Sequence, residues 1–320
     1  MPSATKNVGI MLPRDLPVAE VLDFARRAEE AGFDEVWVVE DLGYRGGIAQ
    51  AASVLAVTSH VTVGVGILPA AVRNVAFAAM EIATLAQLYP GRLVVGIGHG
   101  MPDWLASVGA WPQKPLTFLR EYVAALRALL EGEPGPGRGV YVNAEGVQLK
   151  EIPAVIPPIV LGVRGPKSLA AVGEIADGVV LAEPAAPEYI AHALEQIGDV
   201  DTRVITYDLA VVADSTDEAQ AIVRPALSVL AETDWRPHLL PLPYAEELLQ
   251  HAAELPVDTF THTLPREWVA ELTLAGTVDE VRAGVQRRHD AGATTVVFIP
   301  VGENPSAAMQ ALAEALPDRL

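Results

Sequence analysis

The sequence VTVGVGILPAAVRNVAFAAMEIATLAQLYPGRLVVGIGHGM, residues Val61–Met101, contains two apolar segments separated by a helix-forming region. Val61–Leu68 is rich in β-branched residues, and Gly64 and Gly66 interrupt it where a flat ligand can lie close to the backbone. Leu93–Gly98 is the second apolar segment, and a histidine follows it directly. We therefore predict a strand, a helix and a second strand, with chemistry where the strands end.

The same alternation of strand and helix continues along the chain and predicts a parallel sheet. About eight strands are expected, which favours a (β/α)8 TIM barrel forming one domain over residues 1–320. A doubly wound sheet is the rival fold, but no GxGxxG motif follows the first strand. The other strands are predicted at Val8–Leu12, Glu35–Glu40, Ile159–Val163, Gly178–Leu181, Val204–Val212 and Thr295–Pro300.

Two connections are longer than a barrel needs, so we expect insertions after the fourth and seventh strands. Residues 132–150 open on a turn-rich segment, EGEPGPGRG, which is either a domain linker or, as we prefer, the start of a surface excursion. Val140–Leu149 is predicted to form a hairpin within it. Residues 216–275 have a helical pattern punctuated by prolines and are expected to form a helical insertion that includes a lid.

Composition excludes several classes of function. Lys and Arg total 22 against 41 Asp and Glu, a formal charge of -19, so we expect neither a nucleic-acid nor a membrane partner. An anionic ligand must then be held by local positive groups. The chain has no cysteine, no secretory signal and no motif for a metal site, which indicates a cytoplasmic protein without a metal.

The active site of a TIM barrel lies at the carboxyl ends of its strands. Glu40 and Asp41 follow the second predicted strand, and either can hydrogen-bond a cofactor ring, although Asp41 can instead cap its own loop. His99 follows the fourth strand, where it either acts as an acid or base or simply packs.

The segment LGVRGPKS, residues Leu161–Ser168, turns on glycines between a strand and a helix. Free backbone N–H groups and the helix dipole meet there, which predicts an anion site. Arg164 and Lys167 strengthen it for a phosphate, while the alternative is a glycine turn with two solvated basic residues.

Together these motifs resemble the bacterial luciferase-like monooxygenase superfamily, and more closely its branch that uses the deazaflavin coenzyme F420, which includes the methylene-tetrahydromethanopterin reductases. The resemblance covers nearly the whole chain, and the most specific part is LYPGR with GIGHG after a glycine-bearing third strand. It is carried by VWVVEDLGYRGG (Val36–Gly47), VGVGILPAAVRN (Val63–Asn74), LYPGRLVVGIGHG (Leu88–Gly100), PPIVLGVRGPKSL (Pro157–Leu169), ADGVVLAEP (Ala176–Pro184) and AGATTVVFIPVG (Ala291–Gly302).

The resemblance implies a TIM barrel in which the ring of F420 or FMN lies against the third strand, often over a non-prolyl cis peptide, here near Val65–Gly66. It implies a ring-contacting acid at Asp41 and a phosphate on the loop after the fifth strand. The cofactor contacts that we expect are Asp41, Gly64, Val65, Gly66, Gly98, His99, Gly162, Val163, Arg164, Gly165, Leu181 and Ala182.

Two departures bear on the reaction. In the F420-dependent sugar-phosphate dehydrogenases a histidine follows the ring-contacting acid and a glutamate follows the fourth-strand GxG, but this chain has Leu42 and Met101 there. Sugar-phosphate oxidation is therefore not expected, and His99, Glu40, Tyr44 or no protein group remains as proton carrier.

We expect an F420-dependent oxidoreductase that transfers a hydride to or from a small organic substrate and forms a homodimer. Two alternatives stay open. One is an FMN-dependent monooxygenase that works with a separate reductase, and the other is a barrel that binds cofactor without turnover.

Overall fold

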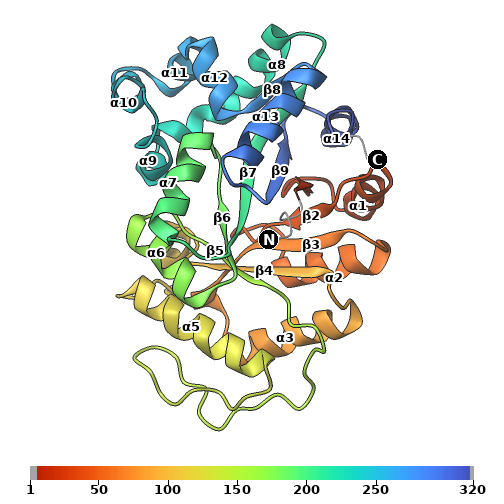
Figure 1. Ribbon diagram of the computed structural model, residues 1–320, viewed down its shortest axis with the longest axis vertical. Coiled ribbons are helices and arrows are strands. Elements are labelled where there is room, and N and C mark those ends of the chain that lie inside the picture. Colours follow the sequence, from red (N-terminus) through yellow and green to blue (C-terminus); the bar gives the residue numbers. More distant parts are fainter. Residues whose placement is uncertain (1–5, 318–320) are drawn as a thin grey trace.

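A computed structural model describes residues 6–317 and shows a closed barrel of parallel strands (Figure 1). Seven strands follow one another around the barrel from β1 to β7, and β9 lies between β7 and β1 to close it. The predicted TIM barrel is confirmed. The strands are β1 (Asn7–Met11), β2 (Glu35–Val38), β3 (Thr62–Pro69), β4 (Leu93–Gly98), β5 (Ile159–Gly162), β6 (Gly178–Leu181), β7 (Arg203–Val212), β8 (Leu274–Gly276) and β9 (Thr295–Pro300).

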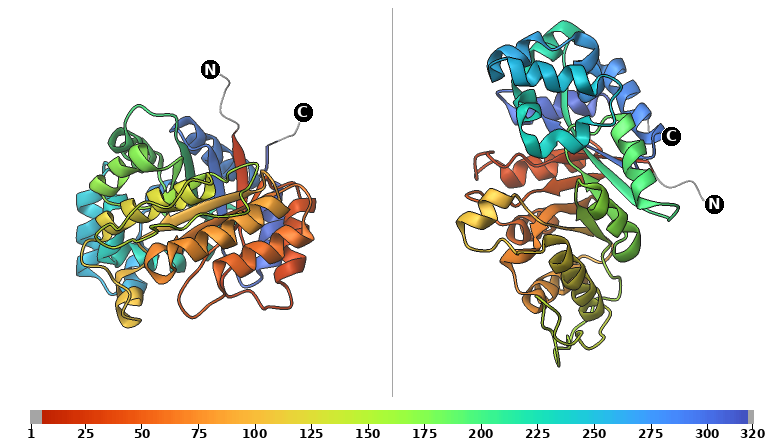
Figure 2. Two further views of the ribbon diagram at one scale, coloured as in Figure 1. Left: turned by 90° about the horizontal axis from the view of Figure 1, so that it is seen from below. Right: turned by 90° about the vertical axis from the view of Figure 1, so that its left-hand side faces the viewer.

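Helices surround the strands on the outside, as the two views of Figure 2 show. Among residues 6–317, no helix combines the length and apolar composition that crossing a bilayer requires. The α-helices are α1 (Val21–Glu30), α2 (Gly47–Val57), α3 (Val75–Leu88), α4 (Pro102–Ser107), α5 (Pro115–Leu130), α6 (Pro166–Ile175), α7 (Pro187–Ile197), α8 (Thr216–Val223), α9 (Arg236–Leu239), α10 (Ala245–Glu254), α11 (Val257–Thr263), α12 (Arg266–Leu272), α13 (Val278–Asp290) and α14 (Pro305–Ala313), and the 3-10 helices are η1 (Ala70–Val72), η2 (Arg224–Ala231) and η3 (Thr233–Trp235).

The short strand β8 was not predicted, because we expected residues 216–275 to be helical throughout. It pairs with Ala210–Val212 at the end of β7. β7 is longer than β6, which pairs only with Arg203–Thr206, so the edge of β7 beyond that point would otherwise be left unpaired. Buried backbone N–H and C=O groups need partners, and β8 supplies them.

The connection from β4 to β5 also differs from prediction. Within the described residues no strand occurs between Leu130 and Ile159, so the expected hairpin at Val140–Leu149 is wrong. The two limbs are joined by single hydrogen bonds, such as that from the Gly139 N–H to the Val142 carbonyl. The Glu121 carboxylate of α5 accepts the N–H groups of Val140, Tyr141 and Val142, and these bonds replace a strand ladder.

The connection from β7 to β9 contains α8 to α12, which pack in a second apolar cluster together with Leu209 and Val211 of β7. Leu227, Leu239 and Phe260 are fully buried in it. Figure 1 shows this helical part at one end of the long axis and the connection from β4 to β5 at the other.

The inside of the barrel is filled by large side chains. Trp37 of β2 is fully buried there, and its ring meets Tyr207 of β7 edge-on with ring centroids 5.8 Å apart. The Trp37 Nε1–H donates to the buried Glu35 carboxylate at 2.8 Å. A Cβ on Gly64 would lie 2.3 Å from the Trp37 ring, so β3 must carry glycine opposite this tryptophan.

We expect Gly64→Ala to destabilise the protein by about 1–3 kcal/mol, because the added methyl group overpacks the barrel interior. The measurement is the midpoint of thermal or urea unfolding. Gly137→Ala is the matched control, since an added Cβ there meets nothing within 4 Å. Unchanged stability of Gly64→Ala would contradict the packing that we describe.

Candidate active site

The candidate site lies at the carboxyl ends of the barrel strands, where the loops after β2, β4, β5 and β6 meet. Tyr207 lies beneath it inside the barrel, and its hydroxyl donates to the Gly66 carbonyl at 3.4 Å. Burial raises the pKa of Tyr207 well above its ordinary value, and the nearby acids add to this shift. Tyr207 and Trp37 therefore close the barrel below the site with neutral groups.

The residues expected to support the ring on β3 are only partly accessible. Gly64 is buried, and Val65 is fully buried on the outer face of the sheet, so neither reaches the site surface. Gly66 is partly exposed, but a Cβ there would lie 1.8 Å from the Tyr207 hydroxyl. Close packing against Trp37 and Tyr207 thus requires glycine at positions 64 and 66, in addition to the ligand contact that the sequence predicts there.

Ile67 forms part of the wall of the site and was missed by sequence reasoning. Strict alternation along β3 would point it outward, but the register shifts between Val65 and Leu68. Its side chain occupies the space next to Gly96, Gly98 and Gly162, where Cβ atoms would come within 2.9, 3.1 and 2.5 Å of it. The cis peptide bond expected near Val65–Gly66 lies one peptide farther on, between Gly66 and Ile67.

Glu40, one of the proton carriers that the sequence predicts, makes several hydrogen bonds within the protein. Arg73 donates to both carboxylate oxygens, at 2.5 and 2.7 Å, and the Gly47 N–H at the start of α2 donates at 2.6 Å. The Glu40 carboxylate therefore joins the loop after β2 to Arg73 and to the start of α2.

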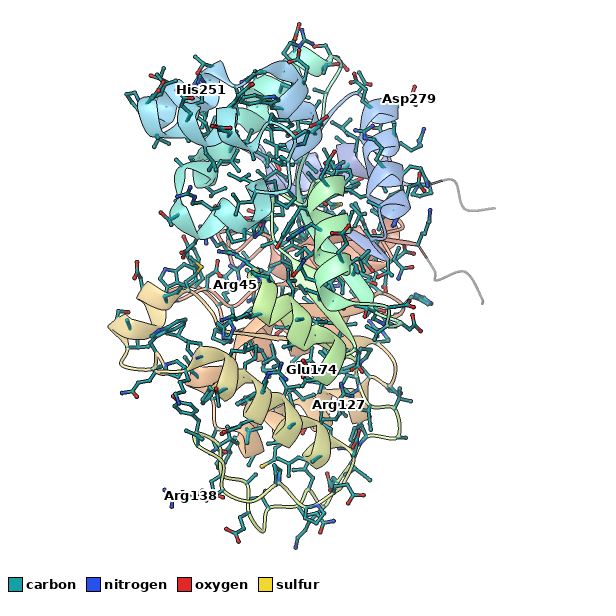
Figure 3. The ribbon with its side chains drawn as sticks, turned by 60° about the vertical axis from the view of Figure 1, so that its left-hand side comes forward. Arg45, Arg127, Arg138, Glu174, His251 and Asp279 are labelled. Carbon is teal, nitrogen blue, oxygen red and sulfur yellow. The ribbon has the colours of Figure 1, made fainter. Side chains whose placement is uncertain are left out.

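Asp41 lies at the mouth of the site and pairs with Arg14 at 2.6 Å. The Arg14 guanidinium also lies 5.0 Å from the centre of the Tyr44 ring, which is half exposed. Arg45 links the same loops by donating to the carbonyls of Leu16 and Pro13. Figure 3 shows Arg45 at mid-height, between His251 of the helical part and Arg138 of the lower connection.

His99 follows β4 and is partly buried. Its imidazole has no hydrogen-bond partner among the described residues. Burial lowers its pKa, because the charged ring loses water, so His99 is neutral at pH 7. A neutral imidazole without a partner is free to donate to or accept from a ligand.

The loop after β5 leads into α6, whose first turn has no side-chain cap. Gly165 is its N-cap, and an added Cβ there would meet nothing within 4 Å. The uncapped N–H groups and the open space fit an anion such as the phosphate of a nucleotide-like cofactor. Gly162, Arg164 and Gly165 are partly exposed, whereas Val163 is buried. The Arg164 guanidinium lies 4.2 Å over the Trp235 ring, a contact with the helical insertion that the sequence did not predict.

The end of β6 contributes a second residue that sequence reasoning did not select. Leu181 is fully buried outside the barrel and Gly98 of β4 is buried inside it, while Ala182 is partly exposed. Glu183 follows and is also partly exposed, and burial raises the pKa of its carboxyl group. Its position directly after a strand was the available signal. Asp177, in contrast, bonds the Ile159 N–H and Arg127 and is structural.

The chain is similar to known proteins along most of its length. The chain is 32% identical to the 5,10-methylenetetrahydromethanopterin reductase of Methanolobus tindarius over 58% of its own length, a match that spans 56% of that reductase. It is 33% identical to the F420-dependent glucose-6-phosphate dehydrogenase of Nakamurella multipartita, over 55% of this chain and 56% of that protein.

Among solved structures, the coenzyme F420-dependent tetrahydromethanopterin reductase of Methanopyrus kandleri has the same fold, with a TM-score of 0.83 and 21% identity over 98% of this chain and 99% of that one. The family model described as luciferase-like monooxygenase matches residues 3–295. The chain therefore belongs to the luciferase-like monooxygenase family.

Proposed function

We propose that this protein is an F420-dependent oxidoreductase that transfers a hydride between the deazaflavin cofactor and a small organic substrate. The observation that carries the proposal is the open, uncapped start of α6 beside Arg164, in a barrel that is similar to proteins named as F420-dependent. The bound deazaflavin supplies a carbon that gives or accepts a hydride.

The protein's own groups hold the reacting partners and exclude water. Trp37 and Tyr207 fill the barrel beneath the site, and Ile67 presents an apolar surface beside Gly98 and Gly162. We propose that the phosphate of the cofactor rests on Gly162–Gly165 and that the Asp41 side chain, held by Arg14, contacts the ring. His99 then faces the substrate as a neutral hydrogen-bond partner.

Equilibrium titrations with F420 and with FMN test the cofactor. We expect F420 to bind more tightly, and tight FMN binding without F420 binding would contradict the proposal in favour of an FMN-dependent monooxygenase. Reduced or oxidised F420 is then followed by absorbance with 5,10-methylenetetrahydromethanopterin, 2-propanol, acetone and glucose 6-phosphate. Because Leu42 and Met101 replace the proton-transfer pair, no turnover of glucose 6-phosphate is expected. Binding without turnover of any of these compounds favours the non-catalytic alternative.

Arg164→Ala is expected to weaken F420 binding about tenfold, because it removes a charged hydrogen bond worth roughly 1.5 kcal/mol at the phosphate. Isothermal titration calorimetry measures the change. Arg120→Ala is the matched control, since Arg120 is also an arginine near α6 but pairs with Glu174 on the outer surface. Equal affinity of Arg164→Ala and wild type would place the phosphate elsewhere.

His99 is expected to titrate below the ordinary histidine pKa of about 6.5, because burial disfavours its charged form. The sign follows from linkage: the neutral ring is favoured in the folded state, so its contribution to stability is present at high pH and lost as pH falls below about 6.5. An NMR titration of the imidazole Cε1 proton, assigned with His99→Gln, measures the midpoint. A midpoint at or above about 6.5 would rule out a neutral His99 at the site.

We also propose that the protein is a homodimer that joins through α3. Phe77, Met80 and Leu88 lie on one outer face of this helix and are 66%, 52% and 64% exposed. An exposed apolar helix face normally has a partner, and most soluble oligomers are symmetric assemblies of one chain.

The double variant Phe77→Asp/Met80→Asp is expected to be monomeric, because the two carboxylates would be buried without partners at the interface. Light scattering after size-exclusion chromatography gives the mass. Val140→Asp is the control, since Val140 is 71% exposed on the connection from β4 to β5. A wild-type monomer at micromolar concentration would overturn the homodimer.

A further inference from the structure

Glu183 is held in place from the helical insertion. The Trp235 Nε1–H donates to the Glu183 carbonyl at 2.8 Å, and His238 Nδ1 lies 3.3 Å from the next carbonyl, that of Pro184. His238 is buried and stacks on Tyr189 with ring centroids 4.4 Å apart. The backbone on which Glu183 stands is thus fixed at two successive carbonyls.

The Glu183 carboxyl, in contrast, has no side-chain partner within residues 6–317. Its own backbone N–H donates a hydrogen bond to it, and no other donor to it is found among the described residues. The charge of Arg164, on the loop after β5, lowers the pKa of Glu183, whereas the charges of Asp208 of β7 and Asp41, on the loop after β2, raise it. A charge on Glu183 also raises the pKa of Tyr207, whose side chain lies inside the barrel.

These surroundings favour the protonated form. Asp208 is paired with the buried Arg288, Asp41 is paired with Arg14, and Arg164 is stacked on Trp235, so none of them pairs with Glu183. Burial lowers the pKa of His238 to about 3, so this neighbour is neutral as well. Burial is the largest cause of the raised pKa of Glu183. It outweighs the charge of Arg164, which lowers that pKa.

We infer that Glu183 is the proton donor of this site, in place of the acid pair that Leu42 and Met101 replace. The inference rests on the proposed function. When a hydride with its electron pair adds to the carbon of a C=O or C=N bond, the π electrons move to the heteroatom. The heteroatom takes the proton of the Glu183 carboxyl, and the resulting carboxylate regains a proton from water. The hydride comes from reduced F420, which is oxidised by two electrons.

The first test needs no substrate. A cofactor that covers Glu183 removes further water from it and raises its pKa again, so the bound state holds the proton more firmly. By linkage, the affinity of wild type for F420 should fall as pH rises from about 6 to about 8, by roughly three- to tenfold more than in Glu183→Gln. The titration of F420's own groups is common to all variants, so the difference between variants is the readout.

Glu195→Gln is the matched control, because Glu195 is an exposed acid in the last turn of α7, at the end of that helix away from the loop after β6. It should keep the wild-type pH dependence. If wild type, Glu195→Gln and Glu183→Gln all show one pH dependence, Glu183 does not face the cofactor and the inference is overturned while the proposed function stands. If wild type binds no F420 at any pH, the proposed function itself is overturned, and the acid role of Glu183 with it.

Stability of the cofactor-free protein gives a second readout. A carboxyl with a raised pKa in the folded state opposes folding once it ionises, so Glu183→Gln should melt about 1–2 °C above wild type near pH 8 and equal to it near pH 4. A melting temperature below that of wild type at every pH would show a packing role and contradict a protonated Glu183.

The third readout is the turnover number. It is measured with the compound that the wild-type enzyme reduces, among those named for the cofactor test. Glu183→Gln should lower kcat by about 100-fold or more with little change in KM, and Glu183→Asp should restore part of it. Wild-type kcat in Glu183→Gln would overturn the acid role.

Discussion

The burial of Trp37 inside the barrel is the constraint on which the rest of the structure depends. Its indole is anchored below by the Glu35 carboxylate, which also accepts from Asn7 and Thr295, and it meets Tyr207 above. The ring takes the space of a side chain at Gly64, and Tyr207 takes that at Gly66. The barrel holds these two aromatic rings because β3, the neighbour of β2, carries glycine beside them. The floor of the site is therefore set by packing.

Much of the fold could be predicted because it is recorded in local patterns. Leu93–Gly98, Pro115–Leu130 and Pro166–Ile175 begin and end where periodicity, proline and glycine indicate. The inward orientation of Ile67 could not be predicted from the sequence. A register shift of β3 against β4 turns it inward, which breaks the alternation of inward and outward side chains that a regular strand has. The glycines Gly64, Gly66 and Gly98 were recognised as unusual, but a sequence does not distinguish a neighbouring indole or isoleucine from a ligand.

The charges at the mouth were harder to predict for a related reason. Glu40 and Arg73 are 33 residues apart, and Asp41 and Arg14 are 27 apart, so their pairing depends on closure of the barrel. Once these pairs form, two of the acids that follow a strand are neutralised locally by arginine. Glu183 has no arginine partner among residues 6–317. The difference between Glu183 and the other two acids, Glu40 and Asp41, therefore depends on tertiary structure.

The helical insertion contributes more to this site than its lack of motifs indicates. Trp235 stacks on Arg164, donates to the Glu183 carbonyl and thereby joins the loop after β5 to the loop after β6. We propose that the loop after β5 binds the phosphate of the cofactor and that the loop after β6 carries the proton donor Glu183. Their geometry therefore depends on a segment that is far away in the sequence and packs in a second apolar cluster. A change in that segment can alter the position of Arg164 and Glu183 without altering the barrel, which gives members of one fold a physical route to different substrates.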